Sequence, residues 1–323
     1  MTRRRVLVSL AVTTAALVAV SFVGCPESRP ESPTSPSSVA APPAVAAPPA
    51  QAPVPLPAPD EVFVGAGDIA QCGGGQSEAT ARLLDGIPGT VFTLGDNVYP
   101  KGTADNYAQC YGPTWGRHKH RTYPTVGNHD WEEASGGPYF AYFGASAGPP
   151  GLGYYSFDLG SWHIISLNSQ TAAAPGSAQY EWLKTDLVAS SADCTLALWH
   201  HPVFSSGTKG NQAQMREVWR LLHRYGADIV LNGDEHVYER FGPQDADGKA
   251  TPGGIREFIV GTGGYSLYDL ARTQPNSEVW ENRTWGVLKL VLRSSSYEWQ
   301  FVPIAGQTFA DSGTGRCVAP PVS

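Results

Sequence analysis

Basic residues are scarce in this sequence of 323 residues, where 22 lysines and arginines face 29 aspartates and glutamates, giving a formal net charge of −7. Nucleic-acid-binding proteins usually carry a basic excess, so this balance argues against that class. Only 16% of the residues are charged and only two are methionine, which argues against a coiled coil or a long solvated helix. Apolar residues make up 41%, too many for a chain that is disordered throughout.

Glycine and proline are abundant, with 36 and 27 residues. This composition suits a protein of strands and loops better than a helical bundle. Nine tryptophans, fourteen tyrosines and eleven phenylalanines supply bulk for a core. The length allows one large domain or two small ones.

The first 25 residues have the pattern of a secretory signal peptide. Three arginines at 3–5 precede an apolar run that ends at Gly24. The Gly24-Cys25 junction resembles a bacterial lipobox, so we expect Cys25 to be acylated and to anchor an exported protein to the cell envelope. Ordinary cleavage, which would give a secreted protein, and an uncleaved anchor are the alternatives. The arginine triplet also resembles a twin-arginine signal.

A tether is predicted for residues 26–59, which are rich in proline, alanine and serine and almost without charge. Such a segment buries too little apolar surface to offset its ordering entropy, and its prolines favour an extended spacer. The globular domain is therefore expected at 60–318, followed by a short tail at 319–323.

Five apolar, strand-like runs of the domain end in aspartate, asparagine or histidine, and segments between them read as helices. This order predicts an α/β fold in which polar side chains gather beyond the carboxyl ends of strands, where such sheets bind ligands. The runs are 61–68, 90–96, 123–130, 194–201 and 228–236, and the helices are 77–85, 178–189 and 212–225.

These terminal residues offer carboxylate, amide and imidazole groups, which suit borderline divalent metals better than calcium. No cysteine lies among them, which argues against a structural zinc site. They are more than one tetrahedral ion needs and are enough for two adjacent ions, roughly 3.5–4 Å apart in sites of this kind.

The ordered set of motifs resembles the calcineurin-like metallophosphoesterases, and most closely the purple acid phosphatases, because Tyr99 stands three residues after Asp96. The resemblance covers about residues 61–303. It implies a two-layer β-sandwich flanked by helices, a four-layer αββα arrangement. The motifs are Gly67-Asp68, Gly95-Asp96-Asn97-Val98-Tyr99, Gly127-Asn128-His129-Asp130, His200-His201-Pro202 and Gly233-Asp234-Glu235-His236.

The resemblance also implies a role for each matching residue. The first metal ion would be held by Asp68, Asp96, Tyr99 and His236, with Asp96 bridging to the second ion. Asn128 and His200 would ligate the second ion. His129 would be the general acid that protonates the leaving group, and His201 would contact a phosphate oxygen or serve packing. Iron paired with zinc or manganese is the expected metal content.

One position departs from the family pattern Gly-His-x-His, because Asp234 stands where the first histidine is expected. Aspartate is also a metal ligand, so the second site would either survive with a further negative charge or bind its ion weakly. Because aspartate adds a hard oxygen ligand and a negative charge, we expect the second site to prefer manganese or magnesium, and monoesters to be turned over slowly relative to diesters.

The function implied by the resemblance is dinuclear-metal-dependent hydrolysis of small phosphate esters, an acid-phosphatase-like activity, with no nucleic-acid or protein partner and membrane contact only through the lipid anchor. Two alternatives are a phosphodiesterase or nucleotidase of the same fold, and a non-catalytic binding protein with a degraded second metal site.

Four cysteines follow Cys25, and four cysteines allow three pairings. Cys72 and Cys110 each lie in a loop beyond a predicted metal-bearing strand end, on the same edge of the sheet. We therefore predict the disulfides Cys72–Cys110 and Cys194–Cys317.

Overall fold

The computed structural model describes residues 59–318. The predicted signal peptide and tail lie outside these residues, as does the predicted tether apart from Pro59. Within the described part, no helix is both long enough and apolar enough to cross a membrane.

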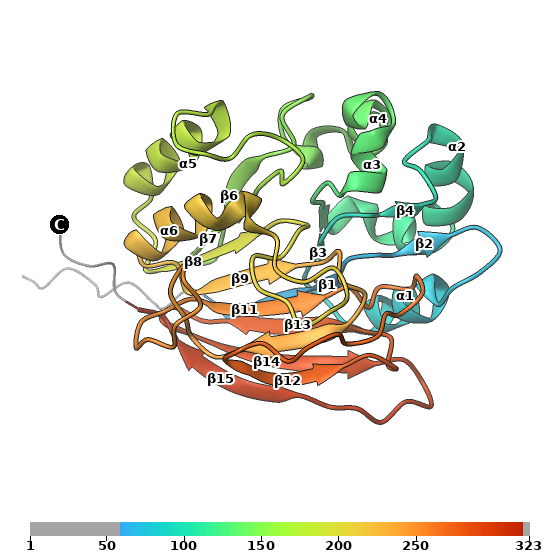
Figure 1. The fold of residues 1–323 in the computed structure, drawn as a ribbon. Helices are drawn as coiled ribbons and strands as arrows, with labels where there is room; N and C mark the ends of the chain where they lie inside the picture. Colours follow the sequence, from blue (N-terminus) through green and yellow to red (C-terminus); the bar gives the residue numbers. More distant parts are fainter. Residues whose placement is uncertain (1–58, 319–323) are drawn as a thin grey trace, which may run out of the picture. The chain divides into compact units, whose positions relative to one another are not determined.

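Two β-sheets form the centre of the fold (Figure 1). The first has six strands in the order β15-β14-β13-β1-β3-β5, and the three strands from the N-terminal part of the domain run parallel to one another. The bounds are β1 Glu61–Ala66, β3 Thr90–Thr93, β5 Thr122–Tyr123, β13 Gly286–Leu292, β14 Ser296–Pro303 and β15 Ser312–Arg316.

The second sheet has seven strands in the order β12-β10-β11-β9-β8-β7-β6, with a parallel centre formed by β7, β8, β9 and β11. A small parallel pair, β2 with β4, stands apart from both sheets. The bounds are β2 Ala70–Gln71, β4 Val98–Tyr99, β6 Tyr155–Leu159, β7 Trp162–Ser166, β8 Cys194–Leu198, β9 Ile229–Asn232, β10 Tyr238–Phe241, β11 Arg256–Val260 and β12 Ser277–Glu281.

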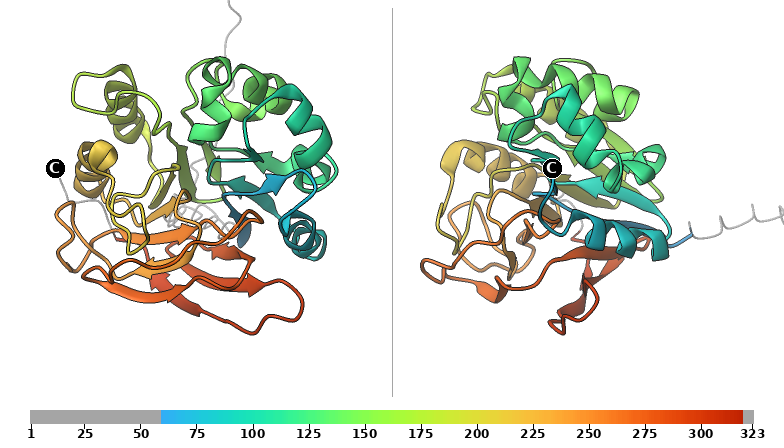
Figure 2. Two further views of the ribbon diagram at one scale, coloured as in Figure 1. Left: turned by 45° about the vertical axis from the view of Figure 1, so that its right-hand side comes forward. Right: turned by 90° about the vertical axis from the view of Figure 1, so that its right-hand side faces the viewer.

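Helices lie on the outer sides of the two sheets (Figure 2). The helices predicted at 77–85 and 178–189 are confirmed, and the one predicted at 212–225 forms as a 3₁₀ turn, Ala213–Met215, that continues into α6. The α-helices are α1 Ser77–Gly86, α2 Ala104–Asn106, α3 Asn128–Glu132, α4 Gly137–Phe143, α5 Ala178–Ala189 and α6 Arg216–Arg224.

Successive side chains of the central strands β8 and β9 point alternately into the core between the sheets and toward the helices outside. In β8 and β9, Leu196 and Ile229 belong to the core between the sheets, together with Phe63 of β1. The next residues along, Ala197 and Val230, point to the opposite face and pack with the apolar sides of α5 and α6. Because successive side chains of a strand face opposite sides, the second sheet contributes to two cores. The predicted four-layer αββα arrangement is confirmed.

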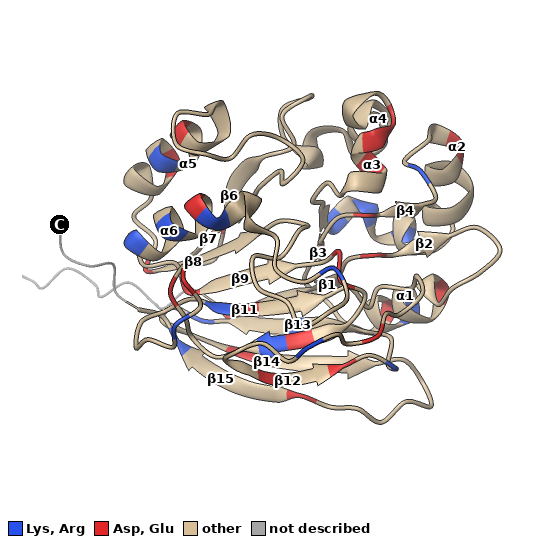
Figure 3. Ribbon diagram, viewed as in Figure 1, with Lys and Arg blue, Asp and Glu red and all other residues tan. Residues whose placement is uncertain are grey.

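Both predicted disulfides are present. Cys72–Cys110 joins the loop after β2 to the π-helical segment Tyr107–Tyr111, beside the carboxyl ends of the first sheet. Cys194–Cys317 closes a separation of 123 residues and ties the start of β8 to the segment after β15. Charged residues of both signs lie on the helices and outer strands, whereas β7, β8 and β9 carry none (Figure 3).

Candidate metal centre

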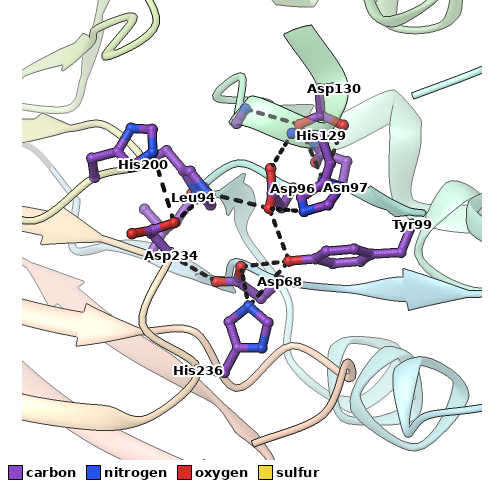
Figure 4. Close-up of polar contacts among 12 residues, drawn as sticks. Asp68, Leu94, Asp96, Asn97, Tyr99, His129, Asp130, His200, Asp234 and His236 are labelled. Carbon is purple, nitrogen blue, oxygen red and sulfur yellow. Dashed lines mark hydrogen bonds and ion pairs between the residues drawn. The ribbon is translucent and has the colours of Figure 1, made fainter. Parts of the chain in front are cut away.

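The carboxyl ends of strands from both sheets meet at one place, and the predicted ligands come together there (Figure 4). Asp68 follows β1, Asp96 follows β3, and Asn128 opens α3 in the first half of the domain. In the second half, His200 follows β8, and the turn after β9 carries Asp234 and His236. The sheet topology thus gathers residues from five separate parts of the chain.

The three strand-end aspartates share an unusual backbone conformation. Asp68, Asp96 and Asp234 have φ values of 59°, 49° and 68°. The left-handed region costs a non-glycine residue free energy and is concentrated at functional sites. Asp234 therefore occupies the same kind of strained turn as the two other aspartates, although its identity departs from the family motif.

The first predicted ligand set is tightly clustered. The hydroxyl of Tyr99 shares its proton between two carboxylate oxygens, Asp68 Oδ1 at 2.8 Å and Asp96 Oδ2 at 2.9 Å. The same hydroxyl lies 3.2 Å from His236 Nε2. His236 Nε2 is 3.1 Å from Asp68 Oδ1, and its other nitrogen faces the carbonyl of Ser266 at 2.6 Å. All four ligands are buried. Three oxygens and one imidazole nitrogen within hydrogen-bond distance fit a single metal ion.

Burial, reinforced by the charges of Asp68 and Asp96, raises the pKa of Tyr99 well above its ordinary value. The metal-free protein therefore keeps the phenol protonated, and a metal ion held by this residue would replace that proton. Burial also raises the pKa of Asp96, but the neighbouring imidazoles outweigh it, and the net shift is downward.

The second predicted set contains two buried atoms that have no hydrogen-bond partner, Asn128 Oδ1 and His200 Nε2. His200 Nδ1 donates to the carbonyl of Leu94 at 2.7 Å, which leaves Nε2 facing Asp96 Oδ2 at 3.4 Å. Buried polar atoms are rarely left unsatisfied, so two such atoms among the predicted ligands fit a role in metal binding. Burial lowers the pKa of His200, yet the surrounding carboxylates raise it to about 10, which shows how strongly this site favours positive charge.

Asp234 lies beside these atoms, with Oδ1 3.5 Å from His200 Nε2, but its oxygens are already engaged. Lys209 Nζ donates to Oδ1 at 2.6 Å and the amide of Gln212 donates to Oδ2. Burial lowers the pKa of Lys209, but Asp234 raises it above its ordinary value, so the pair is ionised. Lys209 therefore balances the negative charge that Asp234 adds to the site.

His129 is held at the open side of the centre, with about a third of its side chain exposed. Its Nδ1 donates to the carbonyl of Pro100 at 2.6 Å, and its Nε2 lies 3.8 Å from Asp96 Oδ2. The ring proton on Nδ1 is thus fixed, and Nε2 is the nitrogen that faces the site. This orientation is the one that the predicted general-acid role requires.

His201 also points toward the centre, with Nε2 3.7 Å from Asp234 Oδ1. Its Nδ1 accepts from the amide of Gln170 at 3.1 Å and lies 2.9 Å from Ser169 Oγ. Burial and then the charge of His200 lower the pKa of His201 to about 4, so the ring is neutral and carries its proton on Nε2. A neutral donor at this position suits contact with a phosphate oxygen.

Asp130 positions the loops that carry the ligands. Its carboxylate accepts from Gly127 N and Asn97 Nδ2, both at 2.9 Å, and from the hydroxyl of Tyr107 at 2.6 Å. Burial, with a smaller effect of Asp96, raises its pKa to about 6. These bonds join the turn at the start of α3 to the loop after β3, which agrees with an orienting role.

Sequence reasoning missed several residues at the centre. Lys209 and Gln212 lie in a loop with no motif, and Tyr265 and Tyr268 follow the glycine-rich turn after β11. Tyr265 stacks on Tyr99 with ring centroids 3.8 Å apart, and Tyr268 stacks on His236 at the same distance. Nothing in the sequence indicated this stacking.

A serine nucleophile of the hydrolase-elbow type is not found here. The sequence Gly-x-Ser-x-Gly occurs at 144–148, but it forms a 3₁₀ turn between α4 and β6. A nucleophile elbow requires a sharp turn from a strand into a helix. Ser146 therefore lacks the setting of a catalytic serine.

The fold and the donor cluster define a metallophosphoesterase. A model of the calcineurin-like phosphoesterase family matches residues 62–238. The chain belongs to this family. Its similarity to purple acid phosphatases implies a dinuclear metal centre.

Curated relatives include purple acid phosphatase 15 of Arabidopsis thaliana, 30% identical over 51% of this chain and 38% of the relative. Probable purple acid phosphatase 20 of the same plant is 30% identical over 61% of this chain and 53% of the relative. The chain thus spans only about two fifths to a half of these relatives.

Solved structures with the same fold include purple acid phosphatase PPD1 from yellow lupin seeds, with a TM-score of 0.67 at 20% identity, covering 80% of this chain and 55% of that one. A structure of PhoD has a TM-score of 0.58 at 14% identity, covering 81% and 69%.

Proposed function

We propose that the protein hydrolyses small phosphate esters with a metal centre built from Asp68, Asp96, Tyr99, Asn128, His200 and His236. The observation that carries the proposal is the pair of buried, partnerless atoms, Asn128 Oδ1 and His200 Nε2, next to the compact first ligand set. Family membership supports the same reaction class.

Metal ions bound in such a centre would polarise phosphoryl oxygens and lower the pKa of a bound water to roughly 7. The chain's own residues then supply orientation and protons. His129 Nε2 faces the centre while the Pro100 carbonyl fixes its other nitrogen, so the protonated ring donates to the departing oxygen of the ester. His201 offers its Nε2 proton to a non-bridging phosphate oxygen.

The substrate class is expected to include monoesters. Since Lys209 balances the charge of Asp234, a dianionic monoester meets no uncompensated carboxylate at this place. This charge balance argues against slow monoester turnover, whereas the preference for manganese or magnesium, which also rests on the hard oxygen of Asp234, stays a prediction. Iron with zinc or manganese remains the metal content that we propose.

We place this activity at the cell envelope, as an exported protein anchored through Cys25 or secreted. The signal-like N-terminus supports export. Two disulfides in the described residues agree with an oxidising compartment.

The test is hydrolysis of 4-nitrophenyl phosphate and bis(4-nitrophenyl) phosphate by the metal-loaded full chain. We expect turnover that a chelator abolishes and that His129→Ala reduces, with His120→Ala as the matched control because His120 is exposed and lies outside the centre. A protein that binds its metals but hydrolyses neither ester would instead fit the non-catalytic alternative, which the engaged carboxylate of Asp234 favours. Hydrolysis of the diester alone would indicate the phosphodiesterase alternative.

A further inference from the structure

Lys209 brings a positive charge into the second half of the metal centre. Its Nζ lies 2.6 Å from Asp234 Oδ1, and the side chain of Asp234 is only 2% exposed. Gln212 donates to the other carboxylate oxygen. The residue at the position of the expected histidine ligand is therefore satisfied by two donors of the chain itself.

The loop that carries Lys209 is firmly held by three buried glutamates. Glu235 accepts from Gly210 N at 2.8 Å and Glu239 accepts from Ser206 N at 2.9 Å. The third, Glu257, lies close to the backbone amides of residues 203–204. These carboxylates come from β10, β11 and the turn before β10, so the loop is fixed along its length and the ammonium is delivered to one place.

Gly207 makes this arrangement possible. A Cβ atom at this position would lie 2.2 Å from Glu235 Oε2, closer than any real contact. The loop therefore approaches Glu235 only because residue 207 has no side chain. Lys209 follows two residues later.

The two halves of the centre differ in what a metal ion must displace. In the first half, an ion replaces the proton of Tyr99, which already lies among Asp68, Asp96 and His236. In the second half, Asn128 and His200 each have a buried atom without a hydrogen-bond partner and Asp96 is expected to bridge, but a further ligand from Asp234 requires displacement of an ammonium. Zinc sites are most often four-coordinate, so Asp234 would be the fourth protein ligand of the second ion.

We propose that Lys209 is a resident cation that competes with the second metal ion for Asp234, so that the protein retains one ion firmly and binds the second reversibly. This inference rests on the metal centre of the proposed function. Lys209 acts through Asp234 and is a positioning residue that sets the affinity of the second site.

The experiment is a calorimetric titration of the metal-stripped full chain with zinc, followed by elemental analysis after desalting. We expect one zinc ion retained by the unsubstituted protein and two by Lys209→Met. The affinity of Lys209→Met for the second ion should rise by roughly 10- to 100-fold, the range found when groups bonded to metal ligands are changed. Lys184→Met, at an exposed position on α5, is the matched control and should behave as the unsubstituted protein.

A second measurement needs no substitution. Reductive methylation of lysines, read by peptide mass spectrometry, should modify Lys209 faster once the second equivalent of zinc is added, because the ion releases the ammonium from Asp234. The first equivalent should leave this rate unchanged.

The proposal is overturned if the unsubstituted protein and Lys209→Met bind the second zinc ion with equal affinity, or if methylation of Lys209 does not respond to the second equivalent. Ester hydrolysis at saturating zinc is measured in parallel. Loss of hydrolysis with the expected stoichiometries would overturn the proposed function alone, whereas hydrolysis with equal affinities would overturn only the role of Lys209.

Discussion

Gly127 controls the position of the carboxylate predicted to bridge the two metal ions, so Gly127→Ala is an informative substitution. A Cβ atom built at Gly127 would lie 2.2 Å from both the backbone nitrogen and Oδ1 of Asp96. The φ of Gly127 is −107°, a value that alanine adopts readily, so the effect comes from space and not from backbone strain.

The size of the effect follows from these distances. Non-bonded heavy atoms are comfortable at roughly 3.5–4.0 Å, so Asp96 or the turn before α3 must move by more than about 1 Å. Metal–ligand distances tolerate only roughly 0.2 Å, so the bridge cannot survive such a shift. We expect metal affinity to fall by at least about tenfold. Overpacking should destabilise the metal-free protein by about 1–3 kcal/mol.

The assay is a zinc titration of Gly127→Ala together with urea unfolding of the metal-stripped protein. Gly86→Ala is the control, because nothing lies within 4 Å of a Cβ at Gly86 and its backbone is helical. That variant should keep its zinc affinity and gain about 0.4–1 kcal/mol of stability. If Gly127→Ala binds zinc as tightly as Gly86→Ala, the placement of Asp96 at the centre is wrong.

Three further predictions concern single side chains. His129→Ala should keep its metal content but slow esters with poor leaving groups most, by about 10²–10⁴-fold, and equal slowing of good and poor leaving groups would exclude a proton-donor role. Tyr99→Phe should remove the visible absorption of an iron-loaded protein, whereas a colourless protein containing only zinc or manganese would refute the iron assignment. Burial lowers the pKa of His163, but Asp186 and Asp158 together raise it above its ordinary value. The protonated ring therefore stabilises the fold at pH values below the unfolded pKa of about 6.5, and this stabilisation is lost as the pH rises through the folded pKa. His163→Gln should therefore lose more stability in urea unfolding at about pH 5.5 than at about pH 9, and a loss independent of pH would contradict the ion-pair role.

Much of this protein was predictable because local sequence patterns fix strands, helices and the residues at strand ends. Apolar runs such as 90–96 end in a ligand residue, and the topology rule for parallel strands then brings those ends together. The disulfide between Cys72 and Cys110 followed from the same reasoning, because both loops open on one edge of the sheet.

Contacts between remote segments were not predictable. Lys209 reaches Asp234 only because glutamates far along the chain hold a loop of small residues that has no periodicity. His163 likewise finds Asp186 on a helix 23 residues away. Such pairings depend on tertiary packing, and a single sequence does not display it.

The most direct test of the central claim is the hydrolysis rate of an aryl phosphate, measured on the metal-stripped full chain as zinc or iron is added back and bound metal is counted. We predict no turnover without metal and a rate that rises with bound metal to a plateau. Turnover that persists without metal, or a fully loaded protein that hydrolyses no phosphate ester, would contradict the account.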